Sequence, residues 1–171
     1  MYNFADYILG ESADETLKIE TRQENADVAL ELVKQCQLKL AIISKDLDPF
    51  VYDNLEFLEA LKSLALRGRH VDIRILIFEP EIVVRRGHKL LDLAGKMSSY
   101  VELRKPSPEY NKFDEAVLIA DEVGYVFRDN AERYNGKVNF NSPRESKYML
   151  EVFNDMWESA KPDPNLRRMH I

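Results

Sequence analysis

The chain has 171 residues, 45% of them hydrophobic and 32% charged, and these values predict a single soluble domain with a sizeable core. Its formal net charge of -6 and pI near 5.2 argue against a nucleic-acid partner, because proteins that grip phosphate backbones usually carry a basic excess. No apolar run approaches the length of a membrane span, and residues 1–20 lack the pattern of a secretory signal. We therefore expect a cytoplasmic protein, and its single cysteine, Cys36, excludes an intrachain disulfide and a cysteine-rich zinc site.

The first half of the chain alternates helix and strand signals. A capping box, TRQE, opens a predicted helix over residues 21–37. Residues 38–44 form a short apolar run rich in β-branched side chains, which predicts a buried strand. Asp53 is the expected cap of a second helix that ends near Gly68, and residues 71–78 form the clearest strand of the chain. The expected buried stripe of the second helix is Leu55, Leu58, Leu61, Leu64 and Ala65.

The second half continues the alternation. A third helix is predicted over residues 81–94, followed by a short strand that ends at Arg104. Residues 113–128 contain two apolar runs, AVLIA and VGYVF, which predict a pair of antiparallel strands. Ser142 and Glu145 form a second capping box that opens the last helix. That helix is expected to bury Met149, Val152, Phe153, Met156 and Trp157.

Strands that alternate with helices of about a dozen residues imply crossover connections. We therefore predict an α/β domain with a mixed, mostly parallel sheet and helices on both of its faces. The domain is expected to span residues 20–160, with an N-terminal extension over residues 1–20 and a tail over residues 161–171. The residues expected in the core are Leu40, Ile42, Ile73, Ile75, Ile77, Val117, Ile119, Phe153 and Trp157.

This order of elements resembles a single half-domain of the phospholipase D-like proteins. The resemblance is carried by the aliphatic strands LAIIS and VDIRILI, the strand pair in AVLIADEVGYVF, and a closing helix that contains FNDMW. It covers residues 20–160, and it implies the α/β fold of that family.

The resemblance also identifies where the catalytic motif of the family would lie. In that family the first strand of the pair carries a histidine, a lysine two residues later and an aspartate five beyond the lysine, followed by a glycine-serine-x-asparagine turn. With Asp121 taken as the aspartate, the histidine position is Asp114 and the lysine position is Ala116. The turn positions are Arg128, Asp129 and Ala131, and neither His70, His88 nor His170 stands two residues before a lysine.

The missing imidazole and ammonium groups bear directly on catalysis. Enzymes of this family attack phosphorus with a neutral imidazole and hold the developing charge with lysines. Asp114 instead places a carboxylate where an anionic phosphodiester would bind. We therefore expect no catalytic residue, no cofactor and no phosphodiesterase activity, and we interpret the chain as a non-catalytic module that binds a partner protein or a small anion. Asp121 is interpreted as the polar residue of a tight turn.

A second hypothesis is a divalent-metal-dependent enzyme or ligand-binding protein. Asp46 and Asp48 follow a predicted buried strand, where open α/β sheets often present ligands, and together with Asp114 and Asp121 they could hold magnesium. The plainer interpretation of Asp46 and Asp48, which we favour, is a turn that caps a helix.

Two further groups have both a functional and a structural interpretation. One group is a basic cluster that could bind a phosphate or an acidic partner, formed by Arg85, Arg86, His88 and Lys89. A solvated helix face also explains these residues, and we favour that interpretation. Cys36 lies on an apolar helical stripe and is expected in the core rather than as a nucleophile.

Assembly is the last expectation from the sequence. The resemblance implies that two half-domains pair around a shared site, so either two copies pair with their hairpins near a two-fold axis or the pairing surface has been lost; of the two, a homodimer is favoured. Such pairing would concentrate the charges of Asp114, Asp121 and Glu122, and this repulsion favours an interface that lies elsewhere.

Overall fold

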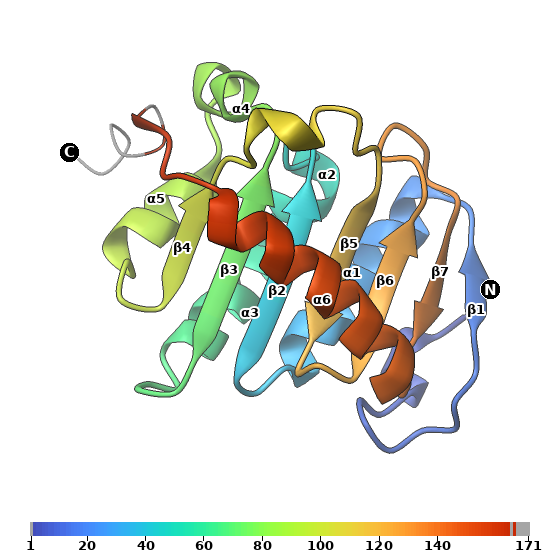
Figure 1. Ribbon diagram of the computed structural model, residues 1–171. Coiled ribbons are helices and arrows are strands. Elements are labelled where there is room, and N and C mark those ends of the chain that lie inside the picture. The colour runs from blue at the N-terminus through green and yellow to red at the C-terminus, as the bar shows by residue number, and fades with distance from the viewer. Residues whose placement is uncertain (1, 165, 167–171) are drawn as a thin grey trace.

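A seven-stranded sheet forms the centre of the protein (Figure 1). The computed structural model describes residues 2–164 and 166. Across the sheet the strand order is β1-β7-β6-β5-β2-β3-β4. The strands are β1 (Leu17–Ile19), β2 (Lys39–Ser44), β3 (Asp72–Ile77), β4 (Val101–Arg104), β5 (Ala116–Ala120), β6 (Gly124–Arg128) and β7 (Gly136–Asn139).

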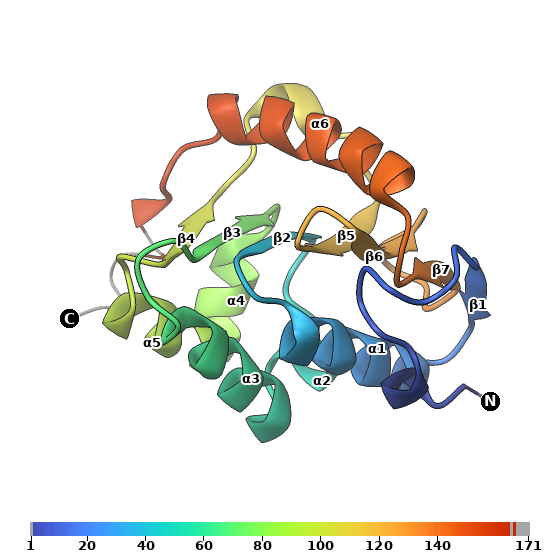
Figure 2. The same ribbon diagram turned by 90° about the horizontal axis from the view of Figure 1, so that it is seen from below.

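The helices lie on both faces of the sheet, as the sequence predicts. They are α1 (Arg22–Gln35), α2 (Pro49–Tyr52), α3 (Leu55–Ala65), α4 (Pro80–Arg86), α5 (Lys89–Lys96) and α6 (Pro143–Ser159), with short 3-10 turns η1 (Phe4–Asp6) and η2 (Pro108–Tyr110). Figure 2 shows that α1, α2, α3, α4 and α5 gather on one face, whereas α6 crosses the other face. None of the helices in the described residues is both long and apolar enough to span a bilayer.

The sheet is mixed, but the expectation that most of its strands are parallel is wrong. β2 pairs in parallel with β3, and β3 with β4. The remaining neighbours, β2 with β5, β5 with β6, β6 with β7 and β7 with β1, are antiparallel. Helix-strand alternation predicts crossovers only where the next strand joins the same side of the sheet. Here the β5–β6 hairpin joins the other side of β2 with its direction reversed.

Side chains that alternate along the strands pack into two separate hydrophobic cores, one on each face of the sheet. Ile42, Ile73 and Ile75 face α1, α2, α3 and α5, whereas Val117 and Ile119 face α6. All nine residues expected in the core are buried. Side chains alternate between the two faces along a strand, and helices cover both faces, so the strand residues among the nine are shielded from water. Phe153 and Trp157 of α6 stack on each other with ring centroids 5.6 Å apart.

The capping box predicted at Thr21 is complete, whereas at Ser142 only the cap bond to the Glu145 amide forms, because the Ser142 amide donates to the carbonyl of Val123. The Thr21 hydroxyl accepts a hydrogen bond from the Glu24 amide at 3.0 Å, and the Glu24 carboxylate accepts one from the Thr21 amide at 3.1 Å. Ser142 accepts from the amide of Glu145 at 3.4 Å and begins α6. The two helix starts that sequence indicates most strongly are therefore correct.

The middle helices differ from the prediction. The cap of α3 is Asn54 rather than Asp53; as a result, Phe57 is buried, while Leu55 is 72% exposed. The helix expected over residues 81–94 is two helices, α4 and α5, because Gly87 adopts a φ of +79°, which ends the first of them. Residues 49–52, where the sequence indicated no helix, form α2.

The N-terminal segment belongs to the domain rather than extending from it. β1 pairs with β7, and Phe4 is buried and stacks on Phe140 at a centroid distance of 6.4 Å. At the other end, Lys161 forms a backbone bridge with Lys105, and Leu166 is buried. The rest of the predicted tail, residues 165 and 167–171, lies outside the described residues.

We expect Ile75→Ala to lower the free energy of unfolding by about 2–4 kcal/mol, because the side chain is fully buried in β3 and its removal leaves a cavity. Leu55→Ala is the matched control, since it removes the same number of carbon atoms from an exposed position and should cost less than about 0.5 kcal/mol. Denaturant melts of both variants measure the difference. Equal effects would contradict the assignment of β3 to the core.

Candidate functional site

Most of the sequence-predicted site residues come together at one edge of the sheet. β2, β3 and β6 end at this edge, and β5 begins there because it runs antiparallel to β2 (Figure 1). We call it the upper edge; it is formed by residues 44–48, 77–80, 114–116 and 128–134.

Asp121 lies at the opposite end of β5, next to the first residue of β2. Its carboxylate accepts hydrogen bonds from the backbone amides of Gln37 at 2.8 Å, Leu38 at 2.9 Å and Lys39 at 3.0 Å. Its own amide donates to the carbonyl of Lys39 at 2.8 Å. The turn is tight, since Asp121 and Glu122 have φ values of +51° and +61°. One side chain thus joins the end of α1, the start of β2 and the β5–β6 turn.

Arg128 lies at the upper edge beside Ala116, the residue to which the phospholipase D-like resemblance assigns the lysine position. Ala116 and Arg128 are directly opposite each other on β5 and β6, and they are only 3% and 7% exposed. Opposite residues of an antiparallel pair project from the same face of the sheet with their Cβ atoms about 4.5–5.5 Å apart. The small side chain of Ala116 therefore leaves room for the guanidinium group.

The guanidinium group of Arg128 is held by the loop that follows β6. Its Nη1 donates to the carbonyls of Arg133 at 2.9 Å and Ala131 at 3.3 Å. The Cζ atom of the guanidinium group lies 5.7 Å from the centre of the Tyr134 ring. The Tyr134 hydroxyl donates in turn to Asp48 at 2.7 Å. Burial, and then this hydrogen bond, raise the pKa of the Tyr134 hydroxyl. We call Arg128, Tyr134 and Asp48 the Arg128 cluster.

The two aspartates after β2 have structural partners. Asp48 caps α2 by accepting from the Phe50 amide at 3.0 Å, in addition to its bond from Tyr134. Asp46 forms an ion pair with Arg86 at 3.3 Å. Asp114 has an exposed side chain, and its backbone carbonyl accepts from the amide of Ala131 at 2.7 Å.

The four aspartates considered as metal ligands do not form one site. Asp46, Asp48 and Asp114 lie at the upper edge, but Asp121 is at the far end of the sheet and is already bound to three amides. Among the described residues, no group of three or more histidine, cysteine, aspartate or glutamate side chains is placed to hold a metal ion. The alternative four-carboxylate arrangement is therefore wrong, because Asp114 and Asp121 lie at opposite ends of β5.

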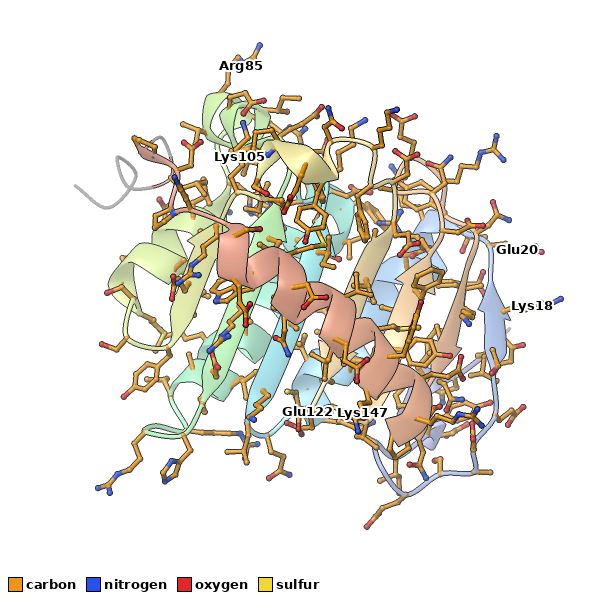
Figure 3. The ribbon with its side chains drawn as sticks, in the orientation of Figure 1. Lys18, Glu20, Arg85, Lys105, Glu122 and Lys147 are labelled. Carbon is orange, nitrogen blue, oxygen red and sulfur yellow. The ribbon has the colours of Figure 1, made fainter. Side chains whose placement is uncertain are left out.

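The basic cluster is divided by the break at Gly87. His88 is buried; its Nδ1 accepts from the Leu90 amide at 3.2 Å, so Nε2 is the protonated nitrogen that donates to the Leu47 carbonyl at 3.0 Å. Burial lowers the pKa of His88, so the ring is neutral and caps α5. Arg85 and Lys89 remain exposed, and Arg85 projects from α4 at the tip of the molecule (Figure 3).

Cys36 is a core residue. Its thiol is buried and donates to the Lys39 carbonyl at 3.1 Å. Burial, followed by the nearby Asp121 carboxylate, raises the pKa of the Cys36 thiol to about 12. A thiol with this pKa is not a nucleophile at neutral pH.

The sequence did not indicate a groove on the α6 face. It has a volume of about 530 Å³ and lies between α6 and strands β5, β6 and β7. Glu145 and Lys137, 3.1 Å apart, flank it as an ion pair. The sequence feature that could have indicated the groove is a pair of apolar residues, Val117 and Phe127, which lie opposite each other on β5 and β6. Its apolar lining is Ile43, Phe113, Val117, Phe127, Met149 and Val152.

Comparison with known protein families identifies the family of this chain. The family described as "Domain of unknown function (DUF7931)" matches residues 21–169, which is most of the chain. The chain belongs to the DUF7931 family. No curated protein matches the chain.

Solved structures with the same fold include members of the phospholipase D family. Nuc from Salmonella typhimurium has a TM-score of 0.62 and 16% identity, over 87% of this chain and 97% of that one. NucT from Helicobacter pylori has a TM-score of 0.63 and 13% identity, over 88% of this chain and 100% of that one. These likenesses show that the DUF7931 domain has a phospholipase D-like fold.

The same fold occurs in TrmBL2, an archaeal chromatin protein, with a TM-score of 0.65 and 22% identity. The match covers 88% of this chain but 54% of TrmBL2, so the chain spans about half of that protein's length.

Removing the carboxylate of Asp121 should destabilise the protein without involving any reaction. We expect Asp121→Ala to lower the free energy of unfolding by about 2–3 kcal/mol, because three amides lose a charged acceptor. Glu122→Ala is the matched control: it removes a carboxylate from the adjacent left-handed position, where the side chain forms only an exposed 3.6 Å ion pair with Lys39, and should cost less than about 0.5 kcal/mol. Urea melts compare the two variants; a smaller loss for Asp121→Ala would contradict the structural role.

Proposed function

We propose that this DUF7931 protein is a non-catalytic phospholipase D-like domain that acts by binding a partner. The observation that carries the proposal is the Arg128 cluster, which fills the upper edge beside Ala116 with a buried cation engaged by backbone carbonyls. An active site of the phospholipase D type needs a nucleophile and free cations at that edge.

Three groups in the described part of the chain that could replace the missing nucleophile are engaged or misplaced. Asp114 presents a carboxylate, which repels a phosphodiester. His88 is buried with both ring nitrogens in hydrogen bonds. The Cys36 thiol faces the core with a raised pKa. The residues that could supply the chemistry therefore serve the fold, which favours a binding role over a catalytic one.

A protein partner suits the surface better than nucleic acid. The structure of TrmBL2 shows a mode of DNA binding, but the present chain has a net charge of -6, and duplex binding depends on neutralising many phosphates. At the upper edge, Lys45 is paired with Glu132 and Arg86 with Asp46, which leaves few cations for a phosphate backbone. A small anion near the exposed Arg85 and Lys89 is the lesser candidate.

The purified protein should leave bis-p-nitrophenyl phosphate, phosphatidylcholine and single-stranded DNA intact, with or without divalent metal, because within residues 2–164 no imidazole lies at the upper edge to attack phosphorus. Product release is measured against a buffer control. Asp114→Ala is the diagnostic variant, since its exposed side chain can be removed without disturbing the core. Turnover that exceeds the buffer control and disappears in Asp114→Ala would overturn the proposal.

Restoring the lysine of the family should fail because Arg128 occupies its surroundings. We expect Ala116→Lys to lower the free energy of unfolding by about 3 kcal/mol or more, since it buries an ammonium group beside a buried guanidinium group. Ala116→Met has a similar length without charge, and its smaller loss reports overpacking alone. Thermal melts compare the two variants. If Ala116→Lys were no less stable than Ala116→Met, the guanidinium group of Arg128 would not occupy the space beside residue 116.

A further inference from the structure

The two faces of the sheet are covered unequally. In the described part of the chain, α1, α2, α3, α4 and α5 pack on one face, whereas α6 crosses the other (Figure 2). Beside α6 lies the groove of about 530 Å³, lined by Phe113, Val117, Phe127 and Met149 among others. Tyr148 stands at its rim and is 70% exposed. Apolar surface of this kind, continuous from a groove to an exposed aromatic ring, marks an interaction site.

The charges on the outer side of α6 are distributed against its dipole. Arg144 and Lys147 are exposed near the N-terminus, and Lys147 projects from this half of the helix in Figure 3. Glu151, Asp155 and Glu158 are exposed toward the C-terminus. The helix dipole favours the opposite arrangement, with acids first and bases last. No ion pair within the described residues involves any of these five side chains, so the fold itself does not use this arrangement.

A helix with one basic and one acidic half is complementary to a reversed copy of itself. The exposed side chains recur every three or four residues and therefore lie on one side of α6. An antiparallel pair about a two-fold axis between Met149 and Leu150 places Arg144 of one copy opposite Asp155 of the other. The same axis places Tyr148 of each copy next to Glu151 of the other, and this centre is flanked by two pairs of opposite charges.

We propose that a second copy of this chain covers the α6 face, with the two α6 helices antiparallel and Tyr148 and the groove buried between the copies. The symmetry is closed, because the same surface serves both copies. A parallel arrangement would bring like charges together and is disfavoured. The interface is separate from the Arg128 cluster, so it holds whether or not the upper edge has an activity. It also avoids the hairpin-centred contact expected from the sequence, in which acidic side chains would meet.

Oligomeric mass and charge reversal test this interface. Sedimentation equilibrium at micromolar concentration should give twice the chain mass of 19.9 kDa. Arg144→Glu places a glutamate opposite Asp155 twice in each dimer, and Asp155→Arg places two arginines together; each should weaken dimerisation by about tenfold or more. The double variant Arg144→Glu/Asp155→Arg should restore dimerisation to within about threefold of the wild type, because it rebuilds both pairs in reverse.

The controls separate the interface from folding. Arg85→Glu makes the same charge change on α4, far from α6, and should leave the dimer unchanged. Thermal melts verify that each variant folds, and the double variant also suits the dipole of α6 better than the wild type. A mass of one chain at all concentrations would overturn the proposal. A dimer that is insensitive to both single variants would overturn it as well, since its interface would lie elsewhere.

Discussion

The antiparallel pairing of β5 with β2, held at one end by Asp121, is the contact on which the rest of the fold depends. β2 is the strand where a parallel half, continued by β3 and β4, meets an antiparallel half, continued by β6, β7 and β1. A shift of one residue in this pairing would exchange the side chains that face α1 with those that face α6. Asp121 opposes such a shift because it binds three successive amides at the start of β2.

The two ends of the same strand differ in what they contribute to the fold. β5 needs its buried aliphatic side chains and its terminal aspartate to join the two halves of the sheet. The residues at its other end, Asp114 and Ala116, are not needed for that contact. Arg128 then stabilises the upper edge by giving its donors to the loop carbonyls, and Tyr134 connects it to Asp48 at the start of α2. The edge is a structural junction between β6, its following loop and α2.

The uneven covering of the sheet follows from the order of the chain. The connections before β5 supply α1 to α5 to one face, and a single helix, α6, follows the last strand and crosses the other. One helix of 17 residues buries Phe153, Met156 and Trp157 against the middle of the sheet, but its N-terminal half leaves the groove open over β5, β6 and β7. The groove therefore lies on the face of the sheet that α6 crosses.

The sequence by itself determined the local features: the capping box at Thr21, the helix cap at Ser142, the strand positions that face a core, and the presence of Asp114 and Ala116 rather than a histidine and a lysine. Hydrophobic period and capping are properties of a few neighbouring residues, so they can be read along the chain. Only the tertiary structure decided the direction of β5, the hydrogen bonds of Tyr134 with Asp48 and of His88 with Leu47, and the open groove beside α6. These depend on contacts between segments far apart, such as Asp121 with Gln37, which are 84 residues apart, and local patterns carry no information about which distant group will meet which.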